Sequence, residues 1–149
     1  MNRWRFVRAV MTACLGLFLL IELIGQPVDA EVSQSLQPLF EKALAAGKDE
    51  EFPRALSLWD HFLELSPGDA AALSNRGNIR LVLGDPEGAI ADHTRAIELS
   101  PLQSDAYLNR GIAEEALQDW QAAESDYNRI LERNPEDPLA LYNLANVRS

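Results

Sequence analysis

Cysteine and histidine are nearly missing from this chain of 149 residues. It has one cysteine, Cys14, and two histidines, His61 and His93. A lone cysteine forms no disulfide within the chain, and the two histidines are too far apart in sequence for the usual spacing of a zinc site. No glycine-rich phosphate-binding loop is present either. The sequence therefore predicts a protein that is not an enzyme and that has no metal site and no cofactor.

Basic residues are also scarce. The chain has 13 lysines and arginines against 23 aspartates and glutamates, which gives a formal net charge of −10. Nucleic acids and anionic lipid surfaces bind to cationic proteins, so neither is an expected partner. Two interpretations of the acidity stay open. It attracts a basic segment of a partner, or it only keeps the protein soluble.

What the sequence does have is a period of 34 residues. Prolines recur at this interval as Pro67, Pro101 and Pro135, and four other kinds of residue keep a fixed distance in front of each proline. They are small residues (Ala43, Gly77, Gly111, with Ala145 next), alanines (Ala55, Ala89, Ala123), rings (Trp59, His93, Tyr127) and glutamates (Glu64, Glu98, Glu132). A period of this length indicates an array of similar supersecondary units, which usually forms a binding surface.

Each unit has the pattern of two helices joined by a turn. Asp85 suits a helix N-cap and Pro86 the first helical position, because the backbone N–H at that position would be unpaired in any case. Gln118-Asp119 breaks the next unit at the corresponding place. The stretches with apolar residues at helical spacing are 73–83, 89–99, 107–117 and 123–131. The sequence therefore predicts an all-α fold.

This pattern resembles the tetratricopeptide repeat, a 34-residue helix hairpin with recurring small, aromatic and proline positions. The resemblance implies a right-handed superhelical solenoid of antiparallel hairpins. Its implied repeats are 36–69, which is atypical, then 70–103, 104–137 and a partial fourth repeat, 138–149. The first helix of the first repeat is expected to be short and loose, because it contains Gly47 and is followed by a run of acidic residues.

Three residues depart from the family pattern. His93 stands where the family has an aromatic ring, so we expect a buried packing ring rather than a general base. Arg76 and Arg110 stand where the family often has leucine. The residues alone do not explain these two arginines.

In the resembled family, the first helices of successive repeats line a concave groove. Asn75, Asn109 and Asn143 recur there at the 34-residue period. A side-chain amide both donates and accepts, so these residues could pair with the backbone of an extended peptide; alternatively, they cap or bridge neighbouring helices. The groove residues implied by the resemblance are Ser74, Asn75, Asn78, Leu81, Asp105, Leu108, Asn109, Ile112, Tyr142 and Asn143.

The expected function is therefore a non-catalytic scaffold that binds a peptide segment of another protein in this groove. Assistance in assembling a membrane complex is a finer expectation. The alternative is a structural or oligomerisation role through the convex face or the exposed C-terminal helix. Family members that clamp the acidic C-termini of heat-shock chaperones place basic residues and asparagine at set groove positions. Of the matching residues Phe40, Leu44, Asn75, Asp105 and Asn109, only Asn75 agrees, and Asp105 has the wrong sign for a carboxylate ligand, so the sequence does not predict such a clamp.

Residues 1–30 have the pattern of a secretory signal peptide. Three arginines, Arg3, Arg5 and Arg8, precede an apolar run over 9–25 that only Glu22 interrupts, and short side chains follow at 28–30. We expect cleavage after Ala30, with a retained N-terminal membrane anchor as the alternative. The expected location is the periplasm or the thylakoid lumen, since the chain looks similar to exported repeat proteins of cyanobacteria and of that lumen. The oligomeric state stays open.

Overall fold

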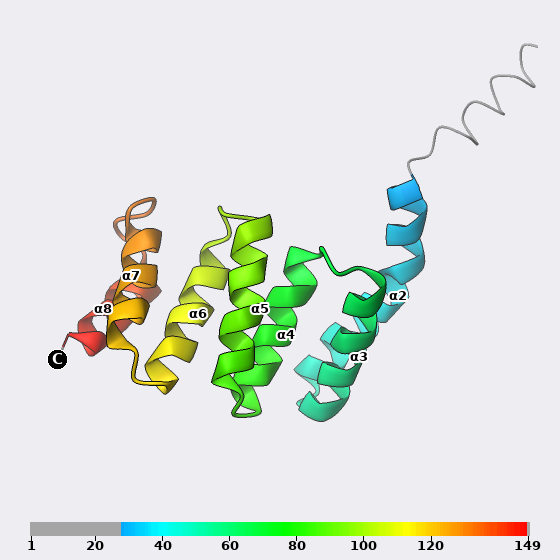
Figure 1. The fold of residues 1–149 in the computed structure, drawn as a ribbon, viewed down its shortest axis with the longest axis horizontal. Helices are drawn as coiled ribbons and strands as arrows, with labels where there is room; N and C mark the ends of the chain where they lie inside the picture. Colours follow the sequence, from blue (N-terminus) through cyan, green and yellow to red (C-terminus); the bar gives the residue numbers. More distant parts are fainter. Residues whose placement is uncertain (1–27, 149) are drawn as a thin grey trace, which may run out of the picture. The chain divides into compact units, whose positions relative to one another are not determined.

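The computed structural model describes residues 28–148, with side chains from Ser35 onward. This part of the chain folds into seven α-helices and contains no strand (Figure 1). The prediction of an all-α fold is confirmed. The helices are α2 (Val28–Lys48), α3 (Phe52–Leu65), α4 (Ala70–Val82), α5 (Pro86–Leu99), α6 (Ser104–Ala116), α7 (Trp120–Leu131) and α8 (Pro138–Val147).

The chain divides into two compact units, residues 1–37 and 38–149. The first unit contains the predicted signal segment, which lies almost entirely outside the described residues. No helix within 28–148 combines the length and the apolar character that crossing a membrane requires. The second unit contains the predicted repeats apart from residues 36 and 37, and all the contacts discussed below belong to it.

Aspartate side chains cap four of the helices at their N-termini. The carboxylates of Asp69, Asp85, Asp119 and Asp137 each accept a hydrogen bond from the backbone N–H three residues later, at 2.8 to 3.2 Å. Such a cap satisfies an N–H group that has no partner within the helix, and it contributes about 1 kcal/mol. The cap predicted at Asp85 is confirmed.

The turn inside each hairpin places one residue in the left-handed region. These residues are Glu50, Gly84 and Gln118, with φ of 60°, 81° and 61°, and they follow the 34-residue period. In each turn the next residue donates its N–H to a carbonyl five residues earlier at 2.9 Å, which closes the first helix. Glycine adopts this conformation freely, whereas a side chain costs about 1 kcal/mol.

The recurring small residues let a ring from the second helix approach the first helix closely. A Cβ on Gly77 would lie 2.8 Å from Nε2 of His93, and a Cβ on Gly111 would lie 2.6 Å from a ring carbon of Tyr127. Both rings are completely buried. The prediction that His93 is a buried packing residue is confirmed, and burial lowers its pKa to about 4.

The first helix of the first repeat differs from our expectation. It was predicted to be short and loose, but α2 is a continuous helix of 21 residues that includes Pro38 and Gly47. Its Phe40 ring packs edge-on against Trp59 at 4.9 Å and against Phe62 at 5.3 Å. This aromatic cluster supplies the packing that the local sequence does not reveal.

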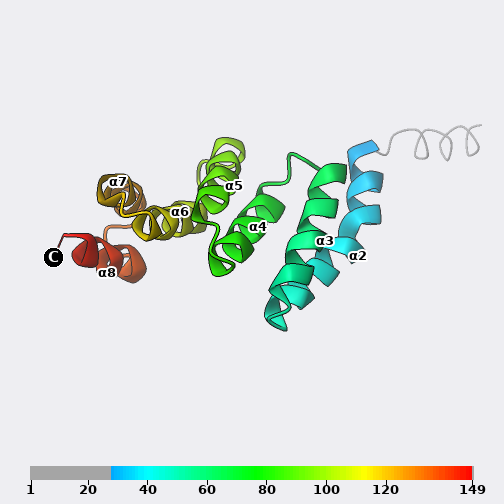
Figure 2. The same ribbon diagram turned by 60° about the horizontal axis from the view of Figure 1, so that its bottom comes forward.

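The helices of the second unit pack as a curved double layer. Each helix from α3 to α8 contacts the next one along the chain. The first helices of the hairpins also contact one another directly, α4 with α6 and α6 with α8, whereas the second helices α5 and α7 do not. Figure 2 shows α5 above α4 and α7 above α8. Because only the first helices approach one another, they form the inner side of the curve.

Candidate functional site

The ten predicted groove residues differ in how far they reach the surface. Nine of them lie on α4, α6 and α8 at half-buried or exposed positions, and we call these nine the first-helix face. Its exposed members are Asp105, Ile112 and Tyr142, and its half-buried members are Asn75, Asn78, Leu81, Leu108, Asn109 and Asn143. The tenth, Ser74, is buried at 8% exposure and lies in the interior. Leu108 also packs against two buried apolar clusters, so it serves the core as well as the face; one cluster is formed by Tyr107, Ile130 and Ala140 and the other by Ala123, Tyr127 and Leu144.

The amides of the first-helix face are open for hydrogen bonding. Asn75, Asn109 and Asn143 recur on successive first helices that are in contact through α6. Among the described residues, none of these three side chains has a hydrogen-bond partner, and the same holds for Asn78. The alternative that they cap or bridge helices therefore has no hydrogen bond to support it in this part of the chain.

The structure explains Arg76 by a bridge across three helices. From α4, this side chain donates two hydrogen bonds to Asp92 on α5, at 2.8 and 2.6 Å, and one to Asp60 on α3, at 2.9 Å. Asp92 is only 3% exposed, so this is a buried, bidentate ion pair. Hydrogen bonding to Asp92 holds the pKa of Arg76 above its ordinary value.

Arg110 repeats this bridge one repeat later. It donates two hydrogen bonds of 2.7 Å to Asp126 on α7 and one of 3.0 Å to Thr94 on α5. Hydrogen bonding to Asp126 likewise raises the pKa of Arg110. We call these two contacts the arginine bridges. Each joins a first helix to the second helix of its own repeat and to that of the preceding repeat.

Sequence reasoning missed the arginine bridges, although a signal for them exists. Each arginine has a polar partner 16 residues before it and an aspartate 16 residues after it. In a hairpin array this spacing connects a first helix to its two flanking second helices. The two arginines are therefore structural and are not available to pair with a ligand.

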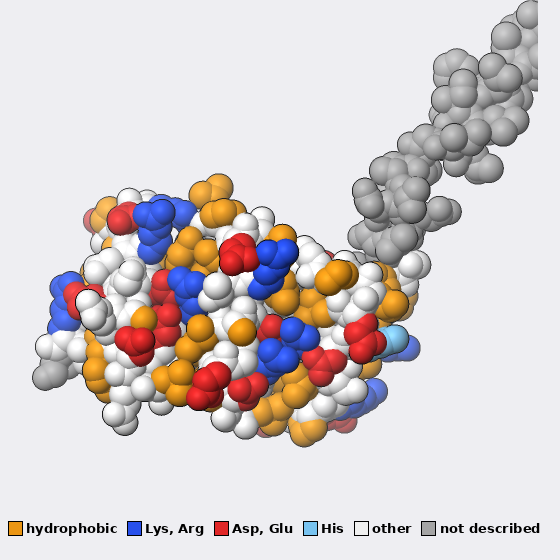
Figure 3. Space-filling view, viewed as in Figure 1, with side chains coloured by type: hydrophobic (Ala, Val, Ile, Leu, Met, Phe, Trp, Pro, Cys, Tyr) orange, Lys and Arg blue, Asp and Glu red, His pale blue; other side chains and the backbone are white. Residues whose placement is uncertain are grey.

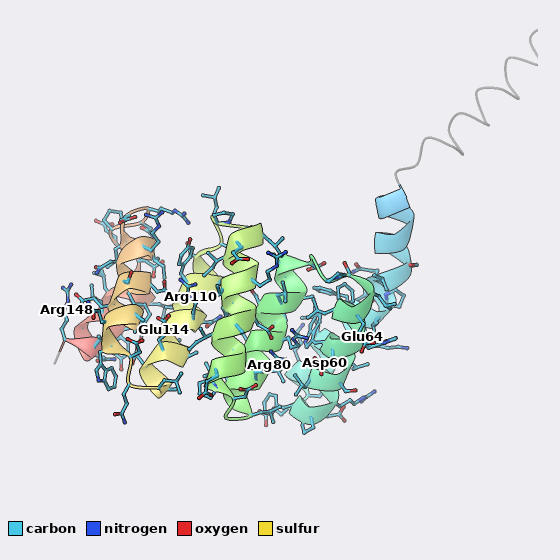
Figure 4. All side chains as sticks on the ribbon, in the orientation of Figure 1. Asp60, Glu64, Arg80, Arg110, Glu114 and Arg148 are labelled. Carbon is cyan, nitrogen blue, oxygen red and sulfur yellow. The ribbon has the colours of Figure 1, made fainter. Side chains whose placement is uncertain are left out.

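Glu114 marks a difference between the two bridges. In the Arg76 bridge, Arg80 adds a second cation beside Asp92, at 3.0 Å. One repeat later, Glu114 takes the register of Arg80, so a carboxylate lies near Asp126 instead (Figure 4 labels Arg80 on α4 and Glu114 on α6). Burial and the charge of Asp126 raise the pKa of Glu114 to about 7, against the opposing effect of Arg110.

The described residues offer no site for a metal ion: no group of three potential ligands is present among them. Two open hollows of about 390 and 400 Å³ lie beside the arginine bridges, one at the α3–α4 junction next to Asp60 and Arg76 and one between α6 and α7 next to Arg110 and Asp126. Asp60 pairs with Arg76 in the first hollow, and Arg110 with Asp126 and Arg129 with Glu132 in the second.

Comparison with known proteins agrees with this architecture. The family model of the tetratricopeptide repeat matches residues 40–104, 83–138 and 108–148. A comparison with curated proteins found no match.

Three solved structures illustrate the likeness. The first tetratricopeptide domain of Spaghetti (RPAP3), bound to the HSP90 peptide SRMEEVD, is 28% identical with a TM-score of 0.75, covering 78% of this chain and 92% of that one. The Arabidopsis OM64 domain is 26% identical with a TM-score of 0.75, covering 78% and 97%. The Yersinia enterocolitica type III secretion chaperone SycD, in complex with a peptide of the translocator YopD, shares the fold at 14% identity, with a TM-score of 0.72 and coverage of 77% and 93%.

Proposed function

Since the chain belongs to the tetratricopeptide repeat family, we propose that it is a scaffold that binds a peptide segment of a partner protein on its first-helix face. The observation that carries this proposal is the set of amides on α4, α6 and α8 that have no partner within the described residues. These amides are half-buried and are not tied to other side chains, so they can exchange solvent for the groups of a ligand without breaking a bond within the protein. An extended peptide presents N–H and C=O groups along its whole length, and such groups match an amide that donates and accepts.

The apolar members of the face supply a second source of affinity. Ile112 is 37% exposed and Tyr142 is 66% exposed, and both lie beside the asparagines on their helices. Covering such side chains with apolar groups of a peptide contributes about 25 cal/mol per Å² of buried area. The amides would hold the backbone of the peptide, and these side chains would contact its apolar residues.

The test compares a double variant with a single-substitution control in the capture and identification of partners from the native source. Asn75→Ala with Asn109→Ala should abolish capture of the partner while changing the helical circular dichroism signal and the midpoint of unfolding little. Asn128→Ala is the matched control, since Asn128 is also half-buried but lies on the second helix α7. Capture that survives the double substitution, or that Asn128→Ala abolishes equally, would show that the first-helix face is not the binding site.

The finer part of the proposal concerns location. We propose that residues 1–30 direct export to the periplasm or the thylakoid lumen and that the scaffold assists the assembly of a membrane complex there. The arginine-rich start, the apolar run and the short side chains at its end support this. Mass spectrometry of the protein from its native source should give an N-terminus at Glu31. An intact Met1 would contradict cleavage and favour a membrane anchor.

An oligomerisation role is the second candidate, because α8 presents apolar side chains to solvent. Leu139, Leu141 and Tyr142 on this helix are 46% to 66% exposed. If α8 forms an interface between two copies, gel filtration should show a dimer, and Leu141→Glu should convert it to a monomer. A wild-type protein that elutes as a monomer at all concentrations would exclude this role.

A further inference from the structure

On the first helices α4, α6 and α8, the positive charges are paired with carboxylates of the protein, whereas some of the negative charges have no cation beside them. The arginines are bound internally: Arg76 and Arg110 form the bridges, and Arg80 contacts Asp92 and the Gly88 carbonyl. Arg148, which follows α8, pairs with Glu124 on α7. No arginine on these helices is left to attract a negatively charged ligand.

Two carboxylates on the same helices have no positively charged side chain beside them. Asp105 is exposed and has no ion-pair or hydrogen-bond partner among the described side chains. Glu115 accepts a hydrogen bond from the hydroxyl of Tyr127 but has no cation beside it. Both lie on α6, and both carry negative charge that is not neutralised by a neighbouring side chain.

These two acids lie on one stripe of α6 together with two other residues of that helix, Asn109 and Ile112; Asp105 belongs to the first-helix face, and Glu115 lies beside it at the edge near α7. Asp105, Asn109, Ile112 and Glu115 follow one another at intervals of three or four residues, so they share one side of α6. Ten residues of helix span about 15 Å. That distance is covered by about four or five residues of an extended peptide. The stripe therefore presents an amide and an apolar side chain between two carboxylates.

The opposite side of the layer has a different charge pattern. On the second helices, Arg95 pairs with Glu98 and Arg129 with Glu132, each at the same register of its repeat. Figure 3 views the molecule from this side and shows basic and acidic side chains interspersed. The two lysines of the chain, Lys42 and Lys48, lie on α2, the first helix of the first repeat, and therefore outside α4, α6 and α8. Among the described residues of α4, α6 and α8, the exposed or half-buried carboxylates that have no cation beside them, Asp105 and Glu115, both lie on α6.

From this arrangement we infer that the first-helix face selects an extended peptide with apolar side chains and a lysine or arginine that pairs with Asp105 or Glu115. An acidic segment would place its carboxylates against α6, where every described arginine on α4, α6 and α8 is already paired with a carboxylate of this chain. The inference rests on the proposed function, which it deepens by naming the charge of the partner segment.

The experiment is a selection of random decapeptides, displayed on phage, against the full-length chain. Enriched peptides should combine apolar residues with lysine or arginine and should be depleted in aspartate and glutamate. A selection against Asp105→Asn with Glu115→Gln should lose the enrichment in basic residues and keep the enrichment in apolar ones. The matched control, Glu87→Gln with Glu136→Gln, removes the same charge at exposed positions outside the face and should leave the selection unchanged.

The contribution of the basic residue to affinity is then measured with one selected peptide. Replacing its basic residue by glutamine should weaken binding to the wild-type chain about fivefold, as expected for one partly exposed ion pair, and should not weaken binding to the Asp105→Asn, Glu115→Gln variant. Enrichment of neutral or acidic peptides would overturn the inference and leave the proposed function standing. An equal loss of basic enrichment in the control variant would also overturn the inference, since the net charge of the protein alone would then explain the preference for basic peptides. No enrichment of any peptide above that seen with Asn75→Ala, Asn109→Ala would overturn the proposed function itself.

Discussion

Replacing Glu114 by glutamine should stabilise the protein at alkaline pH and have little effect in acid. The Glu114 side chain is 12% exposed, and one of its oxygens is buried without a hydrogen-bond partner among the described residues. Its nearest cation is Arg110, at 3.8 Å, and that arginine is already bound to Asp126. An ionised Glu114 therefore adds a second negative charge to a pair that is complete without it.

The sign of the effect follows from the pKa. In the folded chain the pKa of Glu114 is about 7, above its ordinary value of 4.5. The folded chain binds the proton of this carboxyl group more tightly than the unfolded chain does. The free energy of unfolding therefore has its full value below pH 4.5, and it decreases as the pH rises through 7. One pKa unit corresponds to about 1.4 kcal/mol, so the upper bound of the loss is about 3 kcal/mol. Partial contact with solvent reduces the expected value to roughly 1 to 2 kcal/mol.

The assay is urea unfolding of the wild type and of Glu114→Gln at pH 8 and pH 4.5. The free energy of unfolding of the variant should exceed that of the wild type by roughly 1 to 2 kcal/mol at pH 8, and the two should agree at pH 4.5. Glu87→Gln, at an exposed position on α5, serves as the control and should show no such difference. A variant that is less stable at pH 8 would refute the reasoning, because Glu114 would then be an ionised partner of Arg110.

Three further predictions concern the interior. Asp126→Asn should lower the free energy of unfolding by about 3 kcal/mol in urea titrations, because it removes the bidentate carboxylate partner of a half-buried Arg110 and leaves only Glu114, at 3.8 Å, beside it; a loss below 1 kcal/mol would contradict a buried pair. Gly111→Ala should cost about 1 to 3 kcal/mol in the same assay, since its Cβ would overlap the Tyr127 ring, whereas Gly68→Ala, which has nothing within 4 Å, should cost far less. The pKa of His93 is about 4 in the folded chain and 6.5 ordinarily, so as the pH falls this imidazole takes up a proton in the unfolded chain before it does so in the folded one. Stability should therefore fall as the pH drops from 6.5 to 4, and His93→Phe should flatten that slope; an unchanged slope would assign it to other groups.

The hairpin architecture could be predicted because its determinants are local or strictly periodic. The pairing of Gly77 with His93, and of Gly111 with Tyr127, joins a small residue to a ring at a constant spacing, so the sequence displays both partners of each contact. Asp85 could be identified as a cap because its hydrogen bond to Gly88 spans only three residues. The expectation that the first helices line a groove, by contrast, comes from resemblance; the direct contacts of α6 with α4 and α8 show that these helices lie on the inner side of the curve.

The features that sequence reasoning missed all depend on which helices meet. Arg76 was noticed as a departure from leucine, but its partners lie on two other helices, so their relation to it is visible only in a folded array. Ser74 was assigned to the groove by its register, yet its hydroxyl is buried, because a position at the border of a helical stripe is decided by small rotations of the helix. The length of α2 escaped prediction because Pro38 and Gly47 oppose helix formation locally while the aromatic cluster around Phe40 supports it.

The arginine bridges also determine what the outside of the protein presents. From Arg54 onward, every arginine except Arg133 pairs with a carboxylate, and Arg133 donates instead to the Pro101 carbonyl beside the Tyr107 ring. Because the chain is acidic and nearly all of its described arginines are paired with carboxylates, its excess negative charge lies on carboxylates that have no cation beside them. On the first-helix face that carboxylate is Asp105, with Glu115 at the other end of the same stripe. If Asp92 and Asp126 were replaced by neutral residues, Arg76 and Arg110 would each lose one of their carboxylate neighbours, and the interior would become more positive by two charges. The preference for basic peptides should then weaken even though no residue of the face had changed.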